Sequence, residues 1–310
     1  MPTYKIIANP VAGRGNGARA VPAVDRILSQ ARVSFDLVET RGPNEATALA
    51  LQAALDGFAS VVAVGGDGTV HEVVNGLVQA RDGKAGPDGA CLGIVPVGAG
   101  NDFAWSMGLP LNDPEAACRV LLGDCRRVVD LARATDERGQ SWVFNNMLGA
   151  GFDAATALEA SKIQRLRGLP LYLLAVLRTI PRYSQAPQVT VCFNGQCISR
   201  SMLMICVANG RRGGGGFLLA PHALLDDGLL DVTLAGDAGP LVILGLLPHF
   251  VRGTHATQTR YVSSRRASHL VIEAPAGMPM HLEGEIVRTD ARRIEIGVLP
   301  RSLAVISASG

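Results

Sequence analysis

One motif narrows the choice of fold more than any other: an apolar strand that ends in glycines around an aspartate and leads into a helix. Residues 61–64 are all apolar, residues 65–69 read Gly-Gly-Asp-Gly-Thr, and a helical pattern begins at Val70. Glycines let backbone N–H groups approach an anion closely, and the N-terminus of the following helix adds a positive dipole. An ordinary strand-to-helix turn needs only one glycine, so three glycines in four positions favour a phosphate-binding loop.

A second strand, expected at residues 91–97, ends in a similar turn. Residues 98–102 read Gly-Ala-Gly-Asn-Asp, which again places an acid among glycines. Loops at the carboxyl ends of neighbouring parallel strands converge on one crevice, so Asp67 and Asp102 are predicted to share Mg²⁺ and a triphosphate there. The turn at residues 9–17 is predicted to form a third wall, with Arg14 as a phosphate partner.

Strand and helix patterns alternate over the first 130 residues. Strands are expected at residues 4–8, 34–39, 60–64 and 91–97, and helices at residues 18–30, 44–55 and 70–79. Strands separated by helices of this length predict a mainly parallel sheet that is covered by helices. The first half of the chain is therefore expected to be an α/β domain.

After Asp130 the pattern changes to strands separated by turn signals. Asn194 and Gly195 stand between strand-like segments at residues 189–193 and 196–200, and both accept the positive φ angles of a type I′ hairpin turn. Further strands are expected at residues 202–208, 229–234, 267–273, 280–283 and 294–298, and helices at residues 169–180 and 239–251. The second half is therefore expected to be a mainly antiparallel β domain.

Composition and charge exclude several classes of protein. A chain of 310 residues with 48% hydrophobic content can bury a sizeable core and is expected to form two domains. A net charge of +2 gives no argument for nucleic-acid binding. No apolar run reaches the roughly 20 residues of a membrane-spanning helix, and no signal-peptide pattern follows Met1, so we expect a cytoplasmic protein without a transmembrane segment. The six cysteines form no C-x-x-C pair, and a chain of this length does not need a disulfide framework.

Other candidate motifs lack the residue spacing that their functions require. There is no Walker A lysine loop, and His71-Glu72 lacks the second histidine of a zinc-protease helix because residue 75 is Asn. Gly15 and Gly17 imitate part of a dinucleotide-binding fingerprint, but they do not follow directly on a strand. A dinucleotide oxidoreductase therefore remains a weak alternative.

In combination, these motifs resemble the diacylglycerol kinase catalytic-domain family, which includes bacterial lipid kinases and is related to sphingosine and ceramide kinases within an NAD-kinase-like superfamily. The similarity covers nearly the whole chain, through residues 9–13, 65–75, 96–103, 145–154, 207–215, 220–223 and 227–232. It implies an α/β ATP-binding domain at residues 1–132 and an antiparallel β-sandwich domain for the lipid at residues 133–293. Residues 294–310 are expected to return to the first domain, and the active site is expected between the domains.

The resemblance also implies roles for individual residues. Asp102 and Asp130 are expected to organise catalytic Mg²⁺ and water, and Glu283 is expected to act as general base. A structural Mg²⁺ site is expected at Leu224, Asp227 and Leu229, mostly through backbone carbonyls. The expected nucleotide-binding residues are Asn9, Arg14, Thr40, Gly65, Gly66, Asp67, Gly68, Thr69, Val70, His71, Gly98, Ala99 and Gly100.

Three positions differ from the family pattern. Glu283 replaces the aspartate of an Asp-Gly-Glu triplet, Ala12 stands where a serine is usual, and Ala99 where a threonine is usual. Each lost hydroxyl removes a hydrogen bond worth about 1 kcal/mol net, which predicts weaker ATP binding with the same type of reaction.

We therefore expect an ATP- and Mg²⁺-dependent lipid kinase that meets its substrate at the inner face of a membrane. Diacylglycerol, a sphingoid base and another long-chain alcohol all remain open as acceptors, and so does a homodimer. Two further alternatives are a soluble-substrate kinase of the NAD-kinase type and a non-catalytic lipid- or nucleotide-binding protein. An apolar slot beside Glu283, lined from residues 169–180, would favour the lipid kinase.

Overall fold

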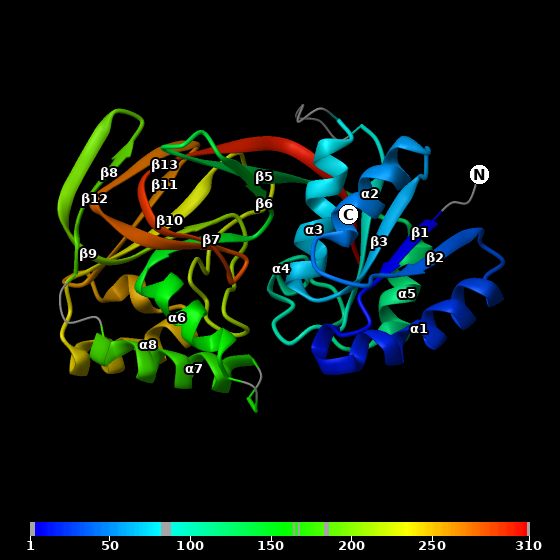
Figure 1. The fold of residues 1–310 in the computed structure, drawn as a ribbon, viewed down its shortest axis with the longest axis horizontal. Coiled ribbons are helices and arrows are strands. Elements are labelled where there is room, and N and C mark those ends of the chain that lie inside the picture. Colours follow the sequence, from blue (N-terminus) through cyan, green and yellow to red (C-terminus); the bar gives the residue numbers. More distant parts are fainter. Residues whose placement is uncertain (1–3, 82–87, 164, 167, 183–185, 309–310) are drawn as a thin grey trace. The chain divides into compact units, whose positions relative to one another are not determined.

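The computed structural model describes residues 4–81, 88–163, 165–166, 168–182 and 186–308, and Figure 1 labels its elements. The chain divides into two compact units: Met1–Leu131 together with Pro300–Gly310, and Ala132–Leu299. Strands β5 (Arg126–Asp136) and β13 (Glu285–Ile306) each begin in one unit and end in the other. The chain therefore passes between the units within these two strands.

The first unit contains a parallel sheet. Its strands are β1 (Tyr4–Ala8), β2 (Phe35–Glu39), β3 (Ser60–Gly65) and β4 (Cys91–Pro96), joined by the end of β13. β1 lies between β2 and β3, β4 follows β3, and β13 pairs with β4, all in parallel. Every residue of β3 and β4 is buried, as in parallel strands that are covered on both faces, which explains why both segments read as nearly continuous apolar runs.

Helices cover both faces of this sheet. α1 (Ala12–Gln30) packs with α5 (Pro114–Gly123), and α2 (Glu45–Leu55) packs with α3 (Asp67–Gln79) on the other face (Figure 1). The short helix α4 (Asp102–Ser106) follows β4. Within α1 the residues Gly13, Arg14 and Gly15 have positive φ angles, so the regular helix begins only after them, closer to the predicted start at residue 18.

The second unit is built from antiparallel strands. They are β6 (Ser141–Phe144), β7 (Met147–Gly151), β8 (Gln188–Phe193), β9 (Gln196–Ala208), β10 (Leu230–Gly236), β11 (Val262–Ala267), β12 (His269–Leu282) and most of β13. Their order is β11-β10-β9-β7-β12-β13, and β5 pairs with β6 and β13. The long strands β9 and β12 each pair with β8 at one end and with β7 at the other, so they link two layers around a shared apolar core.

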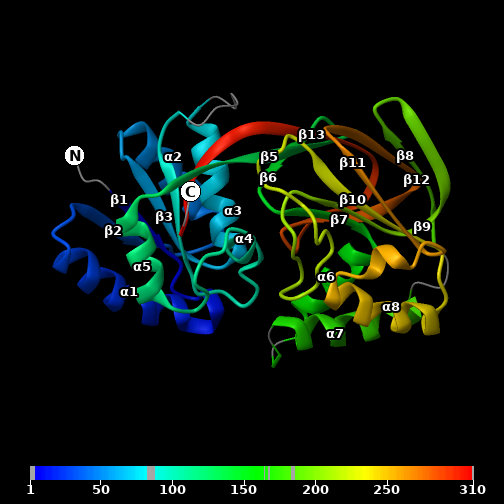
Figure 2. The ribbon, with the colours of Figure 1, turned by 180° about the vertical axis from the view of Figure 1, so that it is seen from behind.

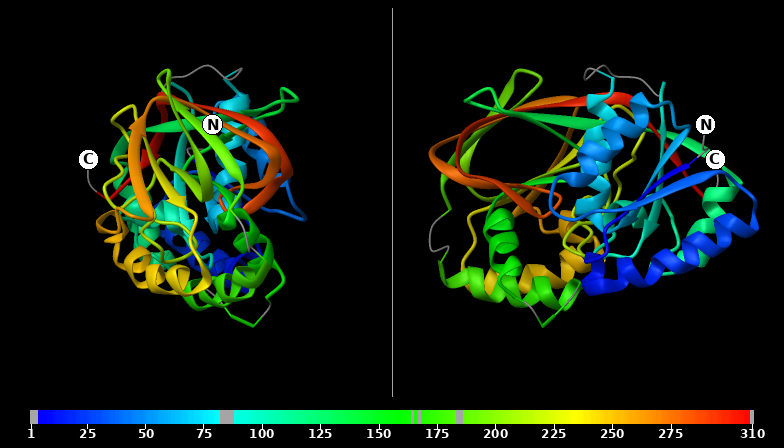
Figure 3. Two further views of the ribbon diagram at one scale, coloured as in Figure 1. Left: turned by 90° about the vertical axis from the view of Figure 1, so that its left-hand side faces the viewer. Right: turned by 45° about the vertical axis from the view of Figure 1, so that its right-hand side comes forward.

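Three helices lie on one side of these strands. They are α6 (Phe152–Ser161), α7 (Gly168–Thr179) and α8 (Pro240–Arg252), accompanied by the 3₁₀ turns η1 (Ile180–Arg182) and η2 (His255–Thr257). Figures 2 and 3 show α6, α7 and α8 gathered on the same side of the second unit's strands. A second apolar cluster, which includes Phe217 and Phe250, lies between these helices and the sheet.

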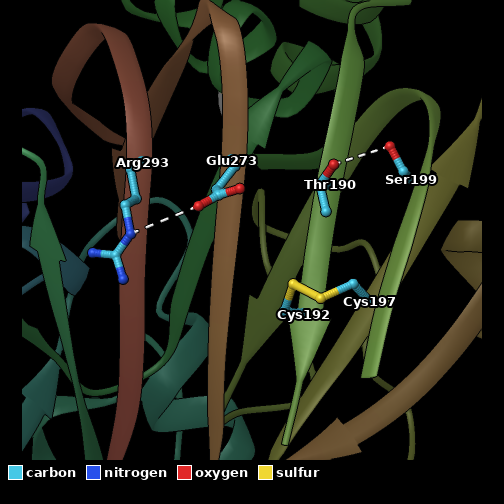
Figure 4. Close-up of a disulfide and its surroundings, with 6 residues drawn as sticks. All are labelled: Thr190, Cys192, Cys197, Ser199, Glu273 and Arg293. Atoms are coloured by element: carbon cyan, nitrogen blue, oxygen red, sulfur yellow. Dashed lines mark hydrogen bonds and ion pairs between the residues drawn. A yellow bond between two sulfur atoms is a disulfide. The ribbon is translucent and has the colours of Figure 1, made fainter. Parts of the chain in front are cut away.

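The predicted hairpin is present between β8 and β9. Asn194 and Gly195 have φ angles of 47° and 87°, as a type I′ turn requires. Beside the turn, Cys192 and Cys197 form a disulfide that the sequence analysis did not predict (Figure 4). The same view shows the hydroxyls of Thr190 and Ser199 hydrogen-bonded across the two strands at 2.9 Å.

The α/β fold class, with an N-terminal α/β part and a C-terminal antiparallel β part, is confirmed. The strand predicted at residues 267–273 is wrong at one boundary. β11 ends at Ala267 and β12 begins at His269, so the segment joins the end of one strand to the start of the next. Strands β5, β6 and β7 were not predicted, because their apolar stretches are interrupted by arginines, asparagines and glycines.

Candidate functional site

Three glycine-containing turns meet at the carboxyl ends of β1, β3 and β4 in the first unit. The N–H of Asn9 donates to the carbonyl of Val64 at 2.9 Å, which continues the pairing of β1 and β3 beyond the end of β1. A Cβ atom placed on Gly98 would lie 2.3 Å from Cα of Gly66, and one placed on Gly13 would lie 2.1 Å from the carbonyl oxygen of Val97. Glycine is therefore required at these positions because backbone packs directly on backbone.

Helix α3 begins directly after β3, and no side chain caps its N-terminus. Its N-cap residue is Gly66, and the N–H of Val70 makes the first helical bond, to the carbonyl of Gly66, at 3.0 Å. The hydroxyl of Thr69 accepts a hydrogen bond from Nδ2 of Asn9 at 3.0 Å, which joins the turn after β1 to the start of α3. The first N–H groups of a helix have no partner within the helix, so this N-terminus is suited to an anion such as phosphate.

The carboxylates of Asp67 and Asp102 lie side by side. Oδ1 of Asp67 accepts the N–H of Asp102 at 2.7 Å and that of Phe103 at 3.2 Å, which ties the start of α3 to the start of α4. The position of a Cβ atom on Gly100 lies 2.8 Å from Oδ2 of Asp67 and 3.3 Å from Oδ2 of Asp102. Burial and then the negative charge of Asp102 raise the pKa of Asp67 to about 7, although the backbone N–H groups act in the opposite direction.

Two carboxylates in this arrangement fit a hard divalent cation. Mg²⁺ in nucleotide sites is held by one or two carboxylates together with phosphate oxygens, which matches the donor set here. A cation between Asp67 and Asp102 would also remove the repulsion that raises the pKa of Asp67. Among the residues that the structure describes, no cluster of three or more metal-binding side chains is found, so the fit rests on this pair.

The backbone of Gly98 is hydrogen-bonded to a side chain of its own loop. Its N–H donates to Oδ1 of Asn101 at 2.9 Å, and Nδ2 of Asn101 donates back to the carbonyl of Gly98 at 3.1 Å. Asn101 is buried and adopts a left-handed conformation with φ of 54°, so it fixes the loop after β4. The sequence analysis missed this residue, although asparagine between a glycine-rich turn and a helix is a signal for such a conformation.

The other predicted nucleotide-binding residues are distributed around these loops. Thr40 is buried, and its N–H donates to the carbonyl of Ala8 at 2.8 Å, so it follows the end of β2. Arg14 has a φ of 60° in the turn before the regular part of α1. His71 lies on α3, where Nδ2 of Asn75 donates to its carbonyl at 2.9 Å.

Asp130 is completely buried in β5. Its Oδ1 accepts the backbone N–H of Arg301 at 2.6 Å, in the part of β13 that belongs to the first unit. Arg301 has a φ of 49°, so the carboxylate fixes an uncommon backbone conformation. This contact gives Asp130 a role in holding β13 in place.

In the second unit, Glu283 occupies the tight turn between β12 and β13. Its Oε1 accepts three consecutive backbone N–H groups, from Asn145 at 3.1 Å, Asn146 at 2.8 Å and Met147 at 3.3 Å. Hydrogen bonds to a carboxylate favour its ionised form. The longer side chain at this position is thus used to reach the amides at the start of β7.

Asp227, one residue of the predicted structural Mg²⁺ site, belongs to a network of ion pairs. Oδ1 of Asp227 accepts the N–H of Leu229 at 3.1 Å, and Oδ2 is ion-paired with the guanidinium of Arg266. Nε of Arg266 also lies 3.4 Å from Oδ2 of Asp231. The guanidinium thus neutralises the carboxylate of Asp227, and the Mg²⁺ site expected at Leu224, Asp227 and Leu229, mostly through backbone carbonyls, stays a prediction.

A pocket with a mainly apolar lining opens between the helices and the strands of the second unit. It is lined by Phe152, Asp153, Thr156, Tyr172, Val176, Leu203, Met204, Gly214, Phe217, Leu219, Ala235, Ile243, Leu246, Leu247 and Phe250. Tyr172 and Val176 come from α7, the helix from which an apolar slot was expected. The hydroxyl of Tyr172 lies 3.0 Å from the position of a Cβ atom on Gly284, so the pocket wall reaches the turn that carries Glu283.

None of the helices in the described part of the chain is long and apolar enough to cross a membrane. The free cysteines of the described residues are Cys91, Cys118, Cys125 and Cys206. Three of them are buried, and none belongs to the loops described above.

Both halves of the sequence match known protein families. Residues 3–134 match the diacylglycerol kinase catalytic domain, and residues 146–307 match the YegS C-terminal NAD kinase beta sandwich-like domain. A diacylglycerol kinase of Mycobacterium tuberculosis is 30% identical over 302 residues, which cover 97% of this chain and 93% of the relative. A probable lipid kinase YegS-like of Pseudomonas aeruginosa is 33% identical over 257 residues, which cover 82% of this chain and 78% of the relative.

Solved structures share the fold. A putative diacylglycerol kinase from Bacillus anthracis superposes with a TM-score of 0.78 at 24% identity and covers 99% of this chain and 97% of its own. A yeast NADH kinase complexed with NADH superposes with a TM-score of 0.52 at 8% identity and covers 99% of this chain and 84% of its own. At these identities the likeness concerns the fold alone.

Proposed function

We propose that this chain, which belongs to the diacylglycerol kinase catalytic-domain family, transfers the γ-phosphoryl group of ATP to a hydroxyl group of a membrane lipid in the presence of Mg²⁺. Membership of the family makes it a kinase related to lipid kinases. The nucleotide, the metal and the lipid acceptor are the parts that we propose. The observation that carries the choice of a lipid is the apolar pocket beneath α6, α7 and α8.

The nucleotide phosphates are proposed to bind at the N-terminus of α3. This assignment is supported by the uncapped helix start after Gly66 and by the close approach of the loop at Gly98. Asp67 and Asp102 would hold Mg²⁺, which when bound neutralises negative charge on the phosphate oxygens. Phosphoryl transfer depends mainly on positioning and on electrostatics, so these groups are sufficient in kind.

Glu283 is proposed to orient the lipid hydroxyl and to accept its proton. The three N–H groups that bind Oε1 keep the carboxylate ionised and fix its direction, which a general base requires. The same three bonds stabilise negative charge and so reduce its basicity. Orientation of the hydroxyl is therefore the larger part of the role that we assign to Glu283.

The acyl chain of the lipid is proposed to occupy the pocket. Its walls consist mainly of aliphatic and aromatic side chains, with Asp153, Thr156 and Tyr172 as the polar members. Ligand pockets of this kind are mostly apolar with a few polar groups that fix orientation. We further propose that the lipid enters from a membrane surface, where molecules with such chains are found.

Phosphorylation of a panel of dispersed lipids tests the proposal. Purified protein is incubated with radiolabelled ATP, Mg²⁺ and micelles that contain diacylglycerol, monoacylglycerol, a sphingoid base or ceramide, and NAD is included as a soluble acceptor. The expected result is a labelled lipid whose formation requires Mg²⁺. Labelled NADP without labelled lipid would instead support a soluble-substrate kinase, and ATP binding without any labelled product would support a non-catalytic protein.

A further inference from the structure

The turn that carries Glu283 has a backbone conformation that few residues adopt. Glu283 has a φ of 52° and Gly284 a φ of 86°, and a left-handed conformation is unfavourable for a residue that is not glycine. The N–H of Glu283 donates to the carbonyl of Met147 at 3.0 Å, which attaches the start of the turn to β7. Groups on the other side of the turn must hold its second half.

His281 holds that second half. Its Nδ1 accepts the backbone N–H of Gly284 at 3.1 Å, and its Nε2 lies 3.0 Å from Oδ2 of Asp153. An imidazole that accepts at Nδ1 must carry its proton at Nε2, so Nε2 donates to the carboxylate. The two bonds therefore fix both the tautomer and the direction of the ring.

The space for this pair is created by a glycine. A Cβ atom on Gly149 would lie 2.2 Å from Nε2 of His281 and 2.2 Å from Oδ2 of Asp153, so any side chain at this position of β7 would displace them. His281 is only 5% exposed, and Asp153 stands in the first turn of α6. The pair is thus enclosed between β7, β12 and α6.

Asp153 also lines the apolar pocket. A chain of contacts therefore runs from the pocket wall through Asp153 and His281 to Gly284, the residue after Glu283. We propose that His281 and Asp153 are a positioning pair, which holds the Glu283 turn in the conformation needed for phosphoryl transfer and links it to the occupied lipid pocket. This inference rests on the function proposed above for Glu283.

A purely structural role would have different consequences. A histidine that only fills space between β7 and β12 would affect stability, and its replacement would change neither the exchange of the amides at Glu283 nor kcat in the folded variant. A positioning role affects kcat in a protein that remains folded, because misplacement by about 1 Å can cost about 10²-fold in rate. The difference can be measured in two independent ways.

The first measurement is amide hydrogen exchange, and it does not depend on activity. In His281→Phe we expect faster exchange at Gly284 and also at Asn145, Asn146 and Met147, whose N–H groups bind Glu283. The matched control is His269→Phe, because His269 lies on the same strand and also pairs with a carboxylate, Glu295, at 3.1 Å, but at an exposed position. His269→Phe should leave the exchange rates of these amides unchanged.

The second measurement is steady-state kinetics with the preferred lipid. We expect His281→Phe to lower kcat about 10²-fold with little change in the KM for ATP. His281→Asn, whose amide oxygen can replace Nδ1 as acceptor for Gly284, should recover part of this loss, and Asp153→Asn should have an intermediate kcat. His269→Phe should keep the kcat of the unaltered protein.

The outcomes separate the two proposals. Unchanged exchange at residues 145–147 in a folded His281→Phe protein would overturn the positioning role, whatever the activity. Faster exchange in a protein that phosphorylates no lipid would support the mechanical link and contradict the lipid kinase assignment instead. If His281→Phe does not fold, the exchange pattern of Asp153→Leu decides, since a side chain without an acceptor for Nε2 no longer orients the ring and should also release Gly284.

Discussion

The backbone N–H of Asp102 donates to Oδ1 of Asp67 at 2.7 Å, so the carboxylate that follows β3 also fixes the start of the helix that follows β4. Oδ2 of Asp67 and Oδ2 of Asp102 both lie close to Gly100. Asp67 therefore has two roles. It joins the loops that follow β3 and β4, and it contributes negative charge beside Gly100. Mutations at this position should separate these roles.

Asp67→Asn should retain the connection and lose the charge. Its amide oxygen can still accept the N–H of Asp102, so the protein should remain folded, whereas kcat/KM for ATP should fall by about 10²–10³-fold. Asp102→Asn should give a similar loss. The control is Asp124→Asn, which alters an exposed carboxylate paired with Arg126. A rate for Asp67→Asn within a factor of two of the unaltered protein would contradict the assignment of the metal site.

Glu283 can be tested by two conservative changes. Glu283→Gln keeps an oxygen that can accept the three N–H groups of residues 145–147, so thermal stability should change little while kcat falls by about 10²–10⁴-fold. Glu283→Asp keeps the charge, but its side chain is one methylene shorter and should lose these bonds. Both variants are compared with Glu285→Gln, two positions along the chain. Full activity of Glu283→Gln would exclude a role as base.

Filling the pocket should affect the lipid and not the nucleotide. Val176 lines the pocket, and a larger residue there occupies the space that we assign to an acyl chain. We expect Val176→Trp to raise the KM for the lipid at least tenfold with an unchanged KM for ATP, as measured at varied lipid concentration in micelles. Leu177→Trp is the matched control, since Leu177 is the next residue and is 50% exposed. Equal effects of both changes would indicate a general disturbance of α7.

His255 should make the second unit sensitive to acid. Burial, followed by the positive charges of His222 and His249, lowers the pKa of His255 from 6.5 to about 4, and its ring stacks on Phe250. The unfolded chain therefore binds a proton more readily than the folded one between these two values. The stability that comes from keeping His255 neutral is fully present above pH 6.5. It is lost as the pH falls toward 4, and the free energy of unfolding decreases by on the order of 3 kcal/mol.

The measurement for this prediction is the unfolding free energy of His255→Phe from pH 7 to pH 4. The variant keeps a ring against Phe250 and cannot be protonated, so the difference from the unaltered protein should shift in favour of the variant as the pH falls. A difference that is constant over this range would show that His255 does not titrate on unfolding.

The disulfide of Cys192 and Cys197 closes a short loop across the turn at Asn194. For a loop of about six residues, the chain-entropy model gives a stabilisation of about 2 kcal/mol. Replacing both cysteines by serine should lower the stability of the protein by this amount and make its melting temperature insensitive to reducing agents. An unaltered protein whose melting temperature does not respond to a reducing agent would contradict this prediction.

The α/β half could be predicted well because its signals are local. The apolar runs of β1, β3 and β4 and the glycines after them are contiguous in the sequence, and buried parallel strands leave a continuous apolar pattern. Gly66 and Gly98 could be identified as loop residues for the same reason. That the two touch each other follows from the order of the strands, which no single segment contains.

The contacts around Glu283 could not be predicted. Asp153 and His281 are 128 residues apart, and nothing in either segment indicates the partner. Arg266 and Asp227 are 39 residues apart, and neither segment indicates that the two side chains pair. Asn101 was missed for another reason, since its role is to satisfy the backbone of Gly98 and such a role leaves only a weak local signal.

The passage of β13 back into the first unit has a consequence for the order of events during synthesis. Leu303, Val305 and Ile306 are completely buried, Val305 is paired with Leu92 of β4, and Arg301 supplies the backbone partner of Asp130. A ribosome makes these residues only after the whole of Ala132–Leu299. Until the second unit has been translated, the nascent first unit therefore lacks the strand that pairs with the free edge of β4.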